Sequence, residues 1–241
     1  MPSEFAAPPN GLRSAPVWDG FVRVFHWSLV ALFVGAVATG KAGGEWIVWH
    51  MRAGYAILAL VLFRILWGFA GGAYARWRSF LAGPGAAAAF IKRLLARGPA
   101  HVIGHNPVGG WMVLVLLVLL AAQGVMGLFS NDEIATTGPL YRYVSEETSI
   151  RLMSWHRQLG NLLLALTGIH IAAVVFHVAV KKEAIVSAMF TGRKALPPEL
   201  AQEAEHATQA RPGRPVVGLI LLSLAMVVVA LAVNWPSLTA R

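Results

Sequence analysis

The sequence predicts an all-α membrane protein with a four-helix transmembrane bundle and a fifth, C-terminal transmembrane helix. Of its 241 residues, 57% are hydrophobic and 13% are charged, and this charged share is about half that of a soluble globular domain. The mean hydropathy is +0.62. Together these values exclude a soluble domain and a disordered chain.

Five apolar stretches are long enough to cross a bilayer, which takes about 20 helical residues. The predicted spans cover residues 22–40, 47–70, 107–129, 155–180 and 216–234. The first 17 residues are rich in proline and lack the pattern of a cleaved signal peptide. We therefore expect four parts, namely a cytoplasmic tail (1–17), a four-helix domain (18–195), a cytoplasmic linker (196–215) and the fifth helix with a short outer tail (216–241).

The distribution of charge predicts the orientation. The chain carries 20 Lys and Arg against 11 Asp and Glu. The basic residues gather in segments 71–106 and 181–215, and such loops stay on the cytoplasmic side. Segment 130–154 has a net charge of −2, from four acidic and two basic residues: Asp132, Glu133, Glu146, Glu147, Arg142 and Arg151. The N-terminus is therefore expected in the cytoplasm and the C-terminus on the outer side of the membrane.

The basic surplus suits anionic lipid better than nucleic acid, because it lies in the loops of a membrane protein. Within segment 71–106, residues 85–98 fit a short amphipathic helix with Phe90, Leu94 and Leu95 towards lipid. A plain basic linker is the alternative interpretation.

Four of the eight histidines lie in or at the ends of spans, at depths that can be compared. His156 and His170 are 14 residues apart on one span, so they share a helix face and are separated by about 21 Å. His26 lies near the inner end of the first span and His50 near the outer end of the second. Each level therefore holds two histidines on different helices. The alternative for any one of them is a hydrogen-bonded structural role.

This arrangement fits two iron porphyrins stacked across the membrane, each held by two imidazoles. Depth pairs His26 with His170 at an inner haem, and His50 with His156 at an outer haem. The chain has no cysteine, which excludes iron–sulfur clusters and covalently attached c-type haem. With both axial positions filled by protein, such haems transfer electrons rather than activate oxygen.

Three further residues have expected roles around the haems. Gly54 and Gly160 each follow an outer ligand by four residues, where a missing side chain lets a macrocycle approach the backbone. Arg64 follows His50 by 14 residues, at the inner level, where its guanidinium suits haem propionates. The alternative for Arg64 is an extended side chain that reaches the cytoplasmic headgroups.

The remaining histidines are weaker candidates. His177 lies 21 residues from His156, about 31 Å along the helix, and is interpreted as interfacial. His105 suits contact with a quinone or a propionate, with a plain loop histidine as the alternative. His206 has no expected role.

Four segments resemble the bacterial cytochrome b561 and nickel–iron hydrogenase cytochrome b family: VWDGFVRVFHWSLV, WHMRAGYAILALVLFRILWGF, GHNPVGGWMVLVLLVLL and SWHRQLGNLLLALTGIHIAAVVFH. The resemblance covers about residues 16–194 and implies a four-helix bundle with two b-type haems. It also implies axial ligands at His26, His50, His156 and His170. The fifth span and the long basic segment between the second and third spans depart from the short family members.

The resemblance implies electron transfer between the quinone pool and a redox partner, such as a c-type cytochrome or a hydrogenase. An electron-transfer subunit of a respiratory chain is therefore expected rather than a stand-alone enzyme. One alternative is a superoxide:quinone oxidoreductase acting at the outer face. A second is a transporter or scaffold without redox function. Lipid, quinone and a redox protein are the expected partners, nucleic acid is not, and a homodimer remains open.

Overall fold

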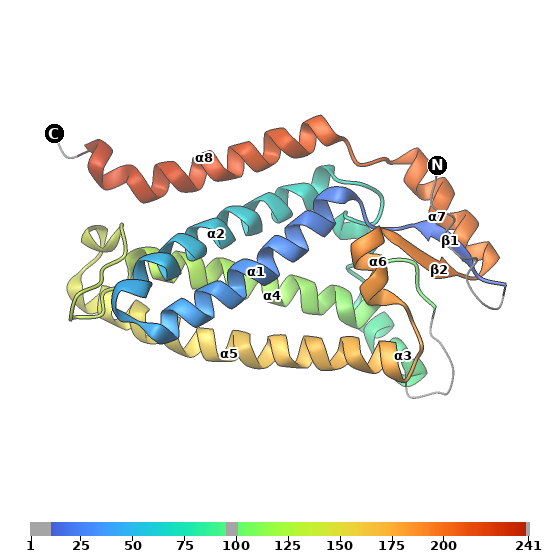
Figure 1. Ribbon diagram of the computed structural model, residues 1–241, viewed down its shortest axis with the longest axis horizontal. Coiled ribbons are helices and arrows are strands. Elements are labelled where there is room, and N and C mark those ends of the chain that lie inside the picture. The colour runs from blue at the N-terminus through green and yellow to red at the C-terminus, as the bar shows by residue number, and fades with distance from the viewer. Residues whose placement is uncertain (1–10, 95–100, 240–241) are drawn as a thin grey trace. The chain divides into compact units, whose positions relative to one another are not determined.

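The computed structural model describes residues 11–94 and 101–239 (Figure 1). Five helices in these ranges are long and apolar enough to cross a membrane. They are α1 (Gly20–Ala42), α2 (Ile47–Ala70), α4 (Pro107–Phe129), α5 (Glu146–Ala179) and α8 (Pro215–Thr239). The five predicted spans are thus confirmed as helices. Helix α5 begins nine residues before its predicted span.

The chain divides into two compact units, which are described separately. The first unit contains Met1–Arg23, Trp67–Val113 and His170–Pro215, and the second contains Val24–Leu66, Leu114–Ile169 and Val216–Arg241. The second unit therefore holds most of α1, α2 and α8, the last two thirds of α4 and the first two thirds of α5.

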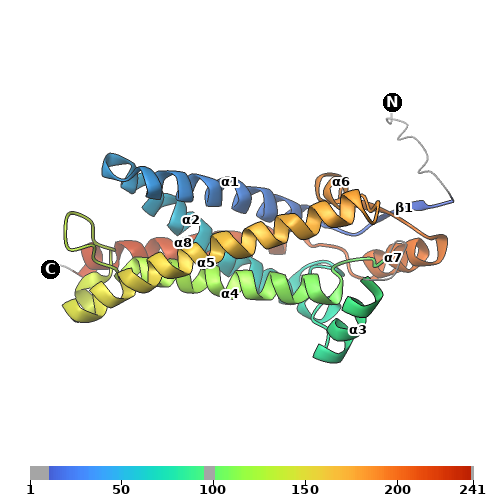
Figure 2. The same cartoon turned by 90° about the horizontal axis from the view of Figure 1, so that it is seen from below.

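The helices of the second unit lie side by side, as Figures 1 and 2 show for its parts of α1, α2, α4 and α5. Val61 and Phe63 on α2 and Leu163 on α5 are at most 2% exposed and form part of its core. In contrast, Val34 on α1 and Val118 on α4 are more than half exposed. Apolar side chains on the outside as well as the inside are typical of helices that face lipid.

The first unit contains a small β-ribbon that the sequence interpretation lacked. Strand β1 (Arg13–Pro16) pairs antiparallel with β2 (Arg193–Leu196), with Arg13 opposite Leu196. Helix α7 (Pro198–Ala210) packs against the ribbon. A hydrophobic cluster holds them together, formed by Ala15, Val17, Ile103, Leu196, Ala201 and Ala204. Segment 196–215, expected to be a linker, is therefore folded over most of its length.

Two further short helices belong to the first unit. Helix α6 (Ile185–Thr191) precedes β2, and α3 (Pro84–Leu94) forms the first part of the predicted amphipathic helix. The expectation that Phe90 faces lipid is wrong, because this side chain is 4% exposed and packs inside the unit. Residues 95–98 of that predicted helix, residues 1–10 of the tail and residues 240–241 lie outside the described ranges.

Side-chain caps fix the starts of two spans. The Asp19 carboxylate accepts a hydrogen bond from the Val22 amide at 2.9 Å, at the first turn of α1. The Asn106 side chain accepts one from the Gly109 amide at 2.7 Å, with Pro107 as the first residue of α4. Each cap satisfies an amide that has no partner within its own helix.

Candidate functional site

Two histidine rings face each other inside the second unit. His50 lies in the first turn of α2 and His156 lies in the N-terminal third of α5. Their ring centroids are 6.0 Å apart and the ring planes are inclined at 84°. Both residues are half-buried, so two imidazoles from different helices meet at one level of the unit.

Backbone carbonyls fix the orientation of both rings. Nδ1 of His50 lies 2.8 Å from the carbonyl oxygen of Ala36 on α1, and Nδ1 of His156 lies 3.0 Å from that of Gln123 on α4. A carbonyl oxygen only accepts hydrogen bonds, so each Nδ1 carries the proton. Each Nε2 then holds a lone pair, which is the form of histidine that binds a metal ion.

Glycines on the neighbouring helices make room for these rings. A Cβ atom on Gly40 of α1 would lie 2.7 Å from Nδ1 of His50. A Cβ atom on Gly127 of α4 would lie 3.2 Å from Cε1 of His156. The first distance is shorter than real Cβ contacts allow, so α1 approaches His50 this closely only because residue 40 has no side chain.

The spacing of the two rings fits axial ligation of a haem iron. Two imidazoles on opposite sides of one metal ion have ring centres roughly 6 Å apart when each nitrogen lies about 2 Å from the metal. The 6.0 Å between His50 and His156 matches this separation. The 84° between the ring planes is compatible with it, because each ring can turn about its metal–nitrogen axis.

The surroundings of the pair also fit a bound group. A Cβ atom on Gly54, one turn after His50, would meet no atom within 4 Å. Gln123 Oε1 is buried and has no hydrogen-bond partner in the part of the chain that the structure describes. The Gln123 amide nitrogen lies 3.4 Å from the place of a Cβ on Gly160, one turn after His156. Open space therefore lies beside Gly54 on α2, and an unsatisfied buried polar atom lies on α4, next to the helix that carries His156.

Comparison with known families decides the class of protein. A family model described as prokaryotic cytochrome b561 matches residues 17–192. The chain belongs to the prokaryotic cytochrome b561 family. No curated protein and no solved structure matches it. Strand β2 and helices α7 and α8 lie beyond the matched residues.

Membership of the cytochrome b561 family gives the general function. The protein is a multi-pass membrane protein of the b-type cytochrome class, which binds haem b and transfers electrons. The histidine pair of the second unit is chemically suited to that cofactor, since it supplies two neutral imidazoles and no other metal-binding side chain.

The remaining expected site residues of this cytochrome lie in both units. His26 on α1 belongs to the second unit, where its ring packs edge-on against Trp27 with centroids 5.0 Å apart. Arg64 on α2 belongs to the same unit and is 2% exposed. This burial does not fit a side chain that extends out to lipid headgroups. His170 on α5 belongs to the first unit and is half-buried.

His177, in contrast, belongs to a buried ionic cluster of the first unit. Its Nδ1 lies 3.5 Å from the Glu183 carboxylate, and Lys194 Nζ lies 3.9 Å from the same oxygen. Lys194 also donates to the Val102 carbonyl at 2.7 Å. Burial lowers the pKa of Lys194, and the Glu183 carboxylate opposes that shift. His177 therefore has a carboxylate partner of its own, which favours a structural role.

His105 lies between two aromatic rings of the first unit. Its ring centroid is 4.6 Å from that of Trp18 and 4.9 Å from that of Phe80. These contacts fix the segment before α4, and they leave both expected roles of this histidine open.

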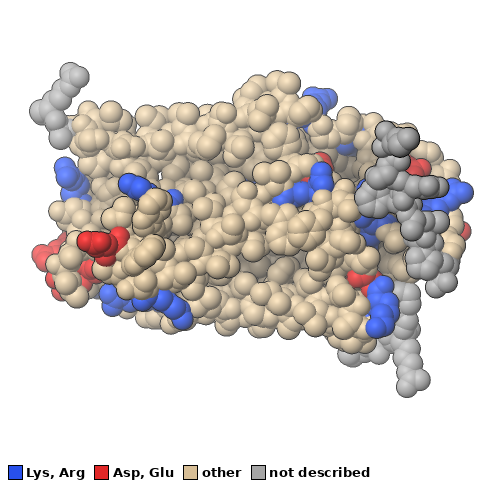
Figure 3. Space-filling view, in the orientation of Figure 1, with Lys and Arg blue, Asp and Glu red and all other residues tan. Residues whose placement is uncertain are grey.

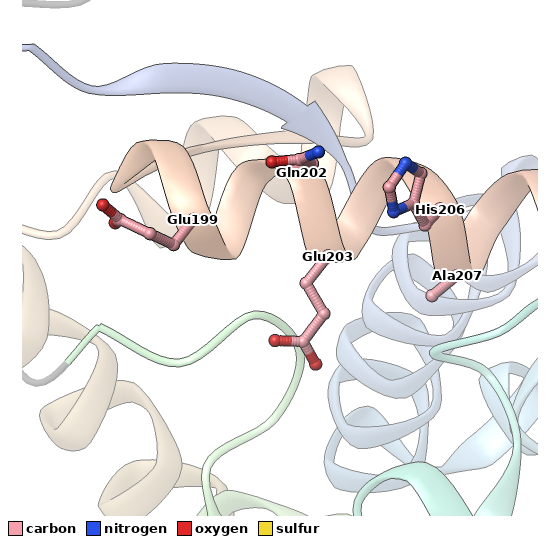
Figure 4. A pocket seen from close by; sticks show the side chains of 5 residues that line it. All are labelled: Glu199, Gln202, Glu203, His206 and Ala207. Atoms are coloured by element: carbon pink, nitrogen blue, oxygen red, sulfur yellow. The ribbon is translucent and has the colours of Figure 1, made fainter.

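A shallow hollow on α7 contains His206, which is exposed. It has a volume of about 620 Å³ and is lined by Glu199, Gln202, Glu203, His206 and Ala207. Figure 4 shows that the Glu203 carboxylate points away from the His206 ring. Within the described residues, no three His, Asp or Glu side chains are arranged to hold a metal ion, so His206 keeps no assigned role.

Sequence reasoning missed several residues that shape the histidine pair. The carbonyl groups of Ala36 and Gln123 belong to the backbone, so the residue types at these positions do not reveal their contacts with the histidines. Gln123 itself was detectable, because it is the one polar amide in the apolar sequence of α4. Gly40 and Gly127 are two of many glycines in the chain, and only the packing distinguishes them.

Proposed function

We propose that this cytochrome transfers electrons across the membrane through two haems b, each bound by two histidines. His50 and His156 hold the outer haem in this proposal. It rests chiefly on one observation, the two imidazole rings with centroids 6.0 Å apart and both Nδ1 atoms directed at backbone carbonyls. The geometry leaves both Nε2 atoms available as ligands.

His26 and His170 hold the inner haem in the same proposal. The 14 residues between His156 and His170 correspond to about 21 Å of helix, nearly four turns on one face. Arg64 is proposed to pair with the propionates at the inner level. Its burial at 2% exposure supports this role, because a buried guanidinium requires an anionic group nearby.

Haem b supplies an iron that alternates between the ferric and ferrous states. The protein residues do the rest. The carbonyls of Ala36 and Gln123 hold the histidine tautomers, and the two imidazoles would hold the iron and take the positions at which oxygen could bind. The amide of Gln123 and the space beside Gly54 line the outer site. The apolar helices exclude water, so little reorganisation accompanies the change of charge.

The proposed partners are the quinone pool and a redox protein, either a c-type cytochrome or a hydrogenase-like subunit. The proposed location is the bacterial inner membrane, with the N-terminus in the cytoplasm and the C-terminus in the periplasm. The basic segments 71–106 and 181–215 support this orientation. The domain boundaries at residues 18, 196 and 216 are proposed with it, with β1, β2 and α7 as a folded addition on the cytoplasmic side.

The superoxide:quinone oxidoreductase alternative requires a cationic surface at the outer face. Arg151 is paired there with Glu147 at 2.6 Å, which weakens its attraction for an anion. The acidic excess of segment 130–154 also disfavours superoxide. Membership of a b-type cytochrome family favours redox transfer over a transporter or scaffold.

A reduced-minus-oxidised visible spectrum of the purified protein tests the proposal, together with the ratio of haem to protein. A low-spin b-type spectrum and a ratio of two are expected. His26→Ala or His170→Ala should each remove one haem, and so should His50→Ala or His156→Ala. His206→Ala, at an exposed position on α7, is the matched control and should keep both. A ratio of one in the wild type would contradict the two-haem arrangement, and a colourless preparation would contradict haem binding itself.

A further inference from the structure

Two segments far apart in the chain lie together in the first unit. The Ala73 amide donates to the Arg211 carbonyl at 3.1 Å. The Asp19 carboxylate accepts a hydrogen bond from the Gly72 amide at 3.3 Å, and a Cβ atom on Gly213 would lie 3.2 Å from the Asp19 Cβ. Asp19 therefore contacts both segments, at Gly72 in segment 71–78 and at Gly213 in segment 211–214.

Each of these segments carries two arginines and no acidic residue: Arg76 and Arg78 in the first, Arg211 and Arg214 in the second. Arg76 is anchored, since its Nε donates to the Gly71 carbonyl at 2.9 Å. Arg78, Arg211 and Arg214 are exposed. Desolvation lowers the pKa of Arg76, and the charges of the other three arginines lower it further. Arg78, Arg211 and Arg214 are thus each close enough to Arg76 for their charges to act on it.

The arginine cluster lies next to the ends of two candidate membrane spans. Helix α2 ends at Ala70, directly before the first segment, and α8 begins at Pro215, directly after the second. The Trp77 indole packs on the end of α2, where a Cβ on Gly68 would collide with it. Phe69 beside it is 69% exposed, with its ring centroid 6.4 Å from that of Trp77. Aromatic side chains of this kind are enriched at the headgroup level of a bilayer.

We propose that Arg76, Arg78, Arg211 and Arg214 form a binding site for an anionic phospholipid, with preference for a headgroup that carries two phosphates. Guanidinium groups bind phosphate oxygens in pairs, so four of them match two phosphates better than one. A bound phosphate would offset the charges that act on Arg76. The exposed Phe69 and the half-buried Trp77 favour a lipid over an acidic protein, because they place apolar surface where the acyl chains begin.

This inference does not depend on the haem ligands, and its test leaves them unchanged. The full-length protein is placed in phosphatidylcholine nanodiscs that contain cardiolipin or, separately, phosphatidylglycerol. Native mass spectrometry then measures the lipid that each sample retains. The wild type should retain cardiolipin in preference to phosphatidylglycerol. Equal retention of the two lipids would contradict the two-phosphate preference.

The test variant is Arg78→Gln/Arg211→Gln/Arg214→Gln, which keeps the anchored Arg76. Each lost guanidinium–phosphate contact weakens binding by about tenfold, so cardiolipin should bind at least about tenfold more weakly than in the wild type. The control variant Lys41→Gln/Arg142→Gln/Arg151→Gln removes the same charge at exposed positions of the second unit and should retain cardiolipin. The single variants Arg78→Gln and Arg214→Gln should give smaller losses, and they serve if the triple variant does not fold.

Three results would overturn the proposal. The first is equal cardiolipin retention by the test and control variants, with an unchanged haem spectrum as evidence of folding. The second is displacement of cardiolipin by inorganic pyrophosphate at comparable concentration, which would indicate a site for soluble phosphate. The third is a test variant that keeps its cardiolipin in native membranes but loses an acidic partner protein, which would indicate a protein-docking surface.

Discussion

Two histidines on the same helix have opposite surroundings. The ring of His156, in the second unit, faces another histidine at 6.0 Å and directs Nδ1 to a backbone carbonyl. The ring of His177, in the first unit, directs Nδ1 to the Glu183 carboxylate at 3.5 Å, and Lys194 lies beside that carboxylate. One residue type on one helix thus serves two different purposes.

The partner of each ring explains the difference. A neutral carbonyl fixes the tautomer of His156 and leaves its Nε2 available to a metal ion, whereas Nδ1 of His177 lies beside a carboxylate that Lys194 also approaches. Gly127 makes room beside His156, while His177 is 8% exposed within a filled ionic cluster. The position of a histidine on a helix face therefore does not by itself identify it as a metal ligand. The groups that contact its ring must also be known.

Gly40→Ala should have the largest effect on the histidine pair. A Cβ at this position would lie 2.7 Å from Nδ1 of His50, so the ring must move away from the Ala36 carbonyl. We expect loss of most of the outer haem, measured as the haem-to-protein ratio.

The control for Gly40→Ala is Gly85→Ala in α3, where a Cβ meets no atom within 4 Å. It should keep both haems and add about 0.5–1 kcal/mol of stability, because alanine is the better helix former. Full haem content in Gly40→Ala would show that the placement of His50 does not depend on the close approach of α1.

Glu183→Gln should destabilise the protein without removing haem. It leaves the buried Lys194 charge without its carboxylate, and removal of one partner of a buried ion pair costs about 3 kcal/mol. Thermal unfolding, followed by loss of the haem absorbance, measures this change.

The double variant Glu183→Gln/Lys194→Met removes both charges and should recover part of the stability. Loss of one haem from Glu183→Gln before unfolding would contradict a purely structural role for the His177 cluster. It would indicate that His177, like His156, contributes to haem binding.

Exposed carboxylates should have a smaller effect, on partner docking. In Figure 3 acidic side chains gather over the segment that joins α4 to α5. Glu147 there is paired with Arg151, and Asp132 is engaged by backbone amides. Glu133→Gln/Glu146→Gln therefore removes the carboxylates best able to attract a basic c-type cytochrome. Electron exchange with it should slow several-fold and depend less on ionic strength.

Glu199→Gln/Glu205→Gln on α7 changes the charge equally and should leave that rate unchanged. A rate that is insensitive to Glu133 and Glu146, with a rapid superoxide reaction that is lost in Arg142→Gln/Arg157→Gln, would favour the superoxide alternative.

Asp132→Asn should have the smallest effect, confined to its loop. The amide of Thr136, followed by those of Ile134 and Ala135, lowers the pKa of Asp132 to about 2. Because the folded-state pKa is depressed, this stabilisation is fully present above the ordinary value of 3.8 and is lost as pH falls through about 2.

Hydrogen exchange of residues 134–136 measures the change. Wild-type protection should persist across neutral and mildly acidic pH and decline only near pH 2, whereas Asp132→Asn should exchange faster at every pH. Equal exchange in both proteins would show that the carboxylate does not hold the loop.

The five spans could be predicted from the sequence because a long apolar run has few other structures available. The cap at Asn106 could be predicted for a similar reason, since the side chain and the following proline act locally. Helix α7 and its β-ribbon could not, because Ala201 and Ala204 become core residues only against Ala15 and Leu196. The sequence of a polar segment does not indicate which distant residues it will pack against.

The candidate site likewise contains some features that the sequence could predict and others that it could not. The positions of His50 and His156 within their spans predicted them as a pair at one depth. The carbonyls that orient them, and the glycines that admit them, depend on the packing of α1 and α4, which residue type does not encode. Phe90 was placed wrongly for a related reason, since amphipathicity marks an apolar face without saying whether lipid or protein covers it.

The haem-to-protein ratio of His156→Ala, compared with that of His177→Ala, tests the central claim most directly. Both variants remove one imidazole from α5, and folding is checked by the spectrum of the haem that remains. We predict a ratio of one in His156→Ala and of two in His177→Ala. A ratio of two in His156→Ala, or of one in His177→Ala, would contradict the assignment of the facing histidine pair as the haem ligands.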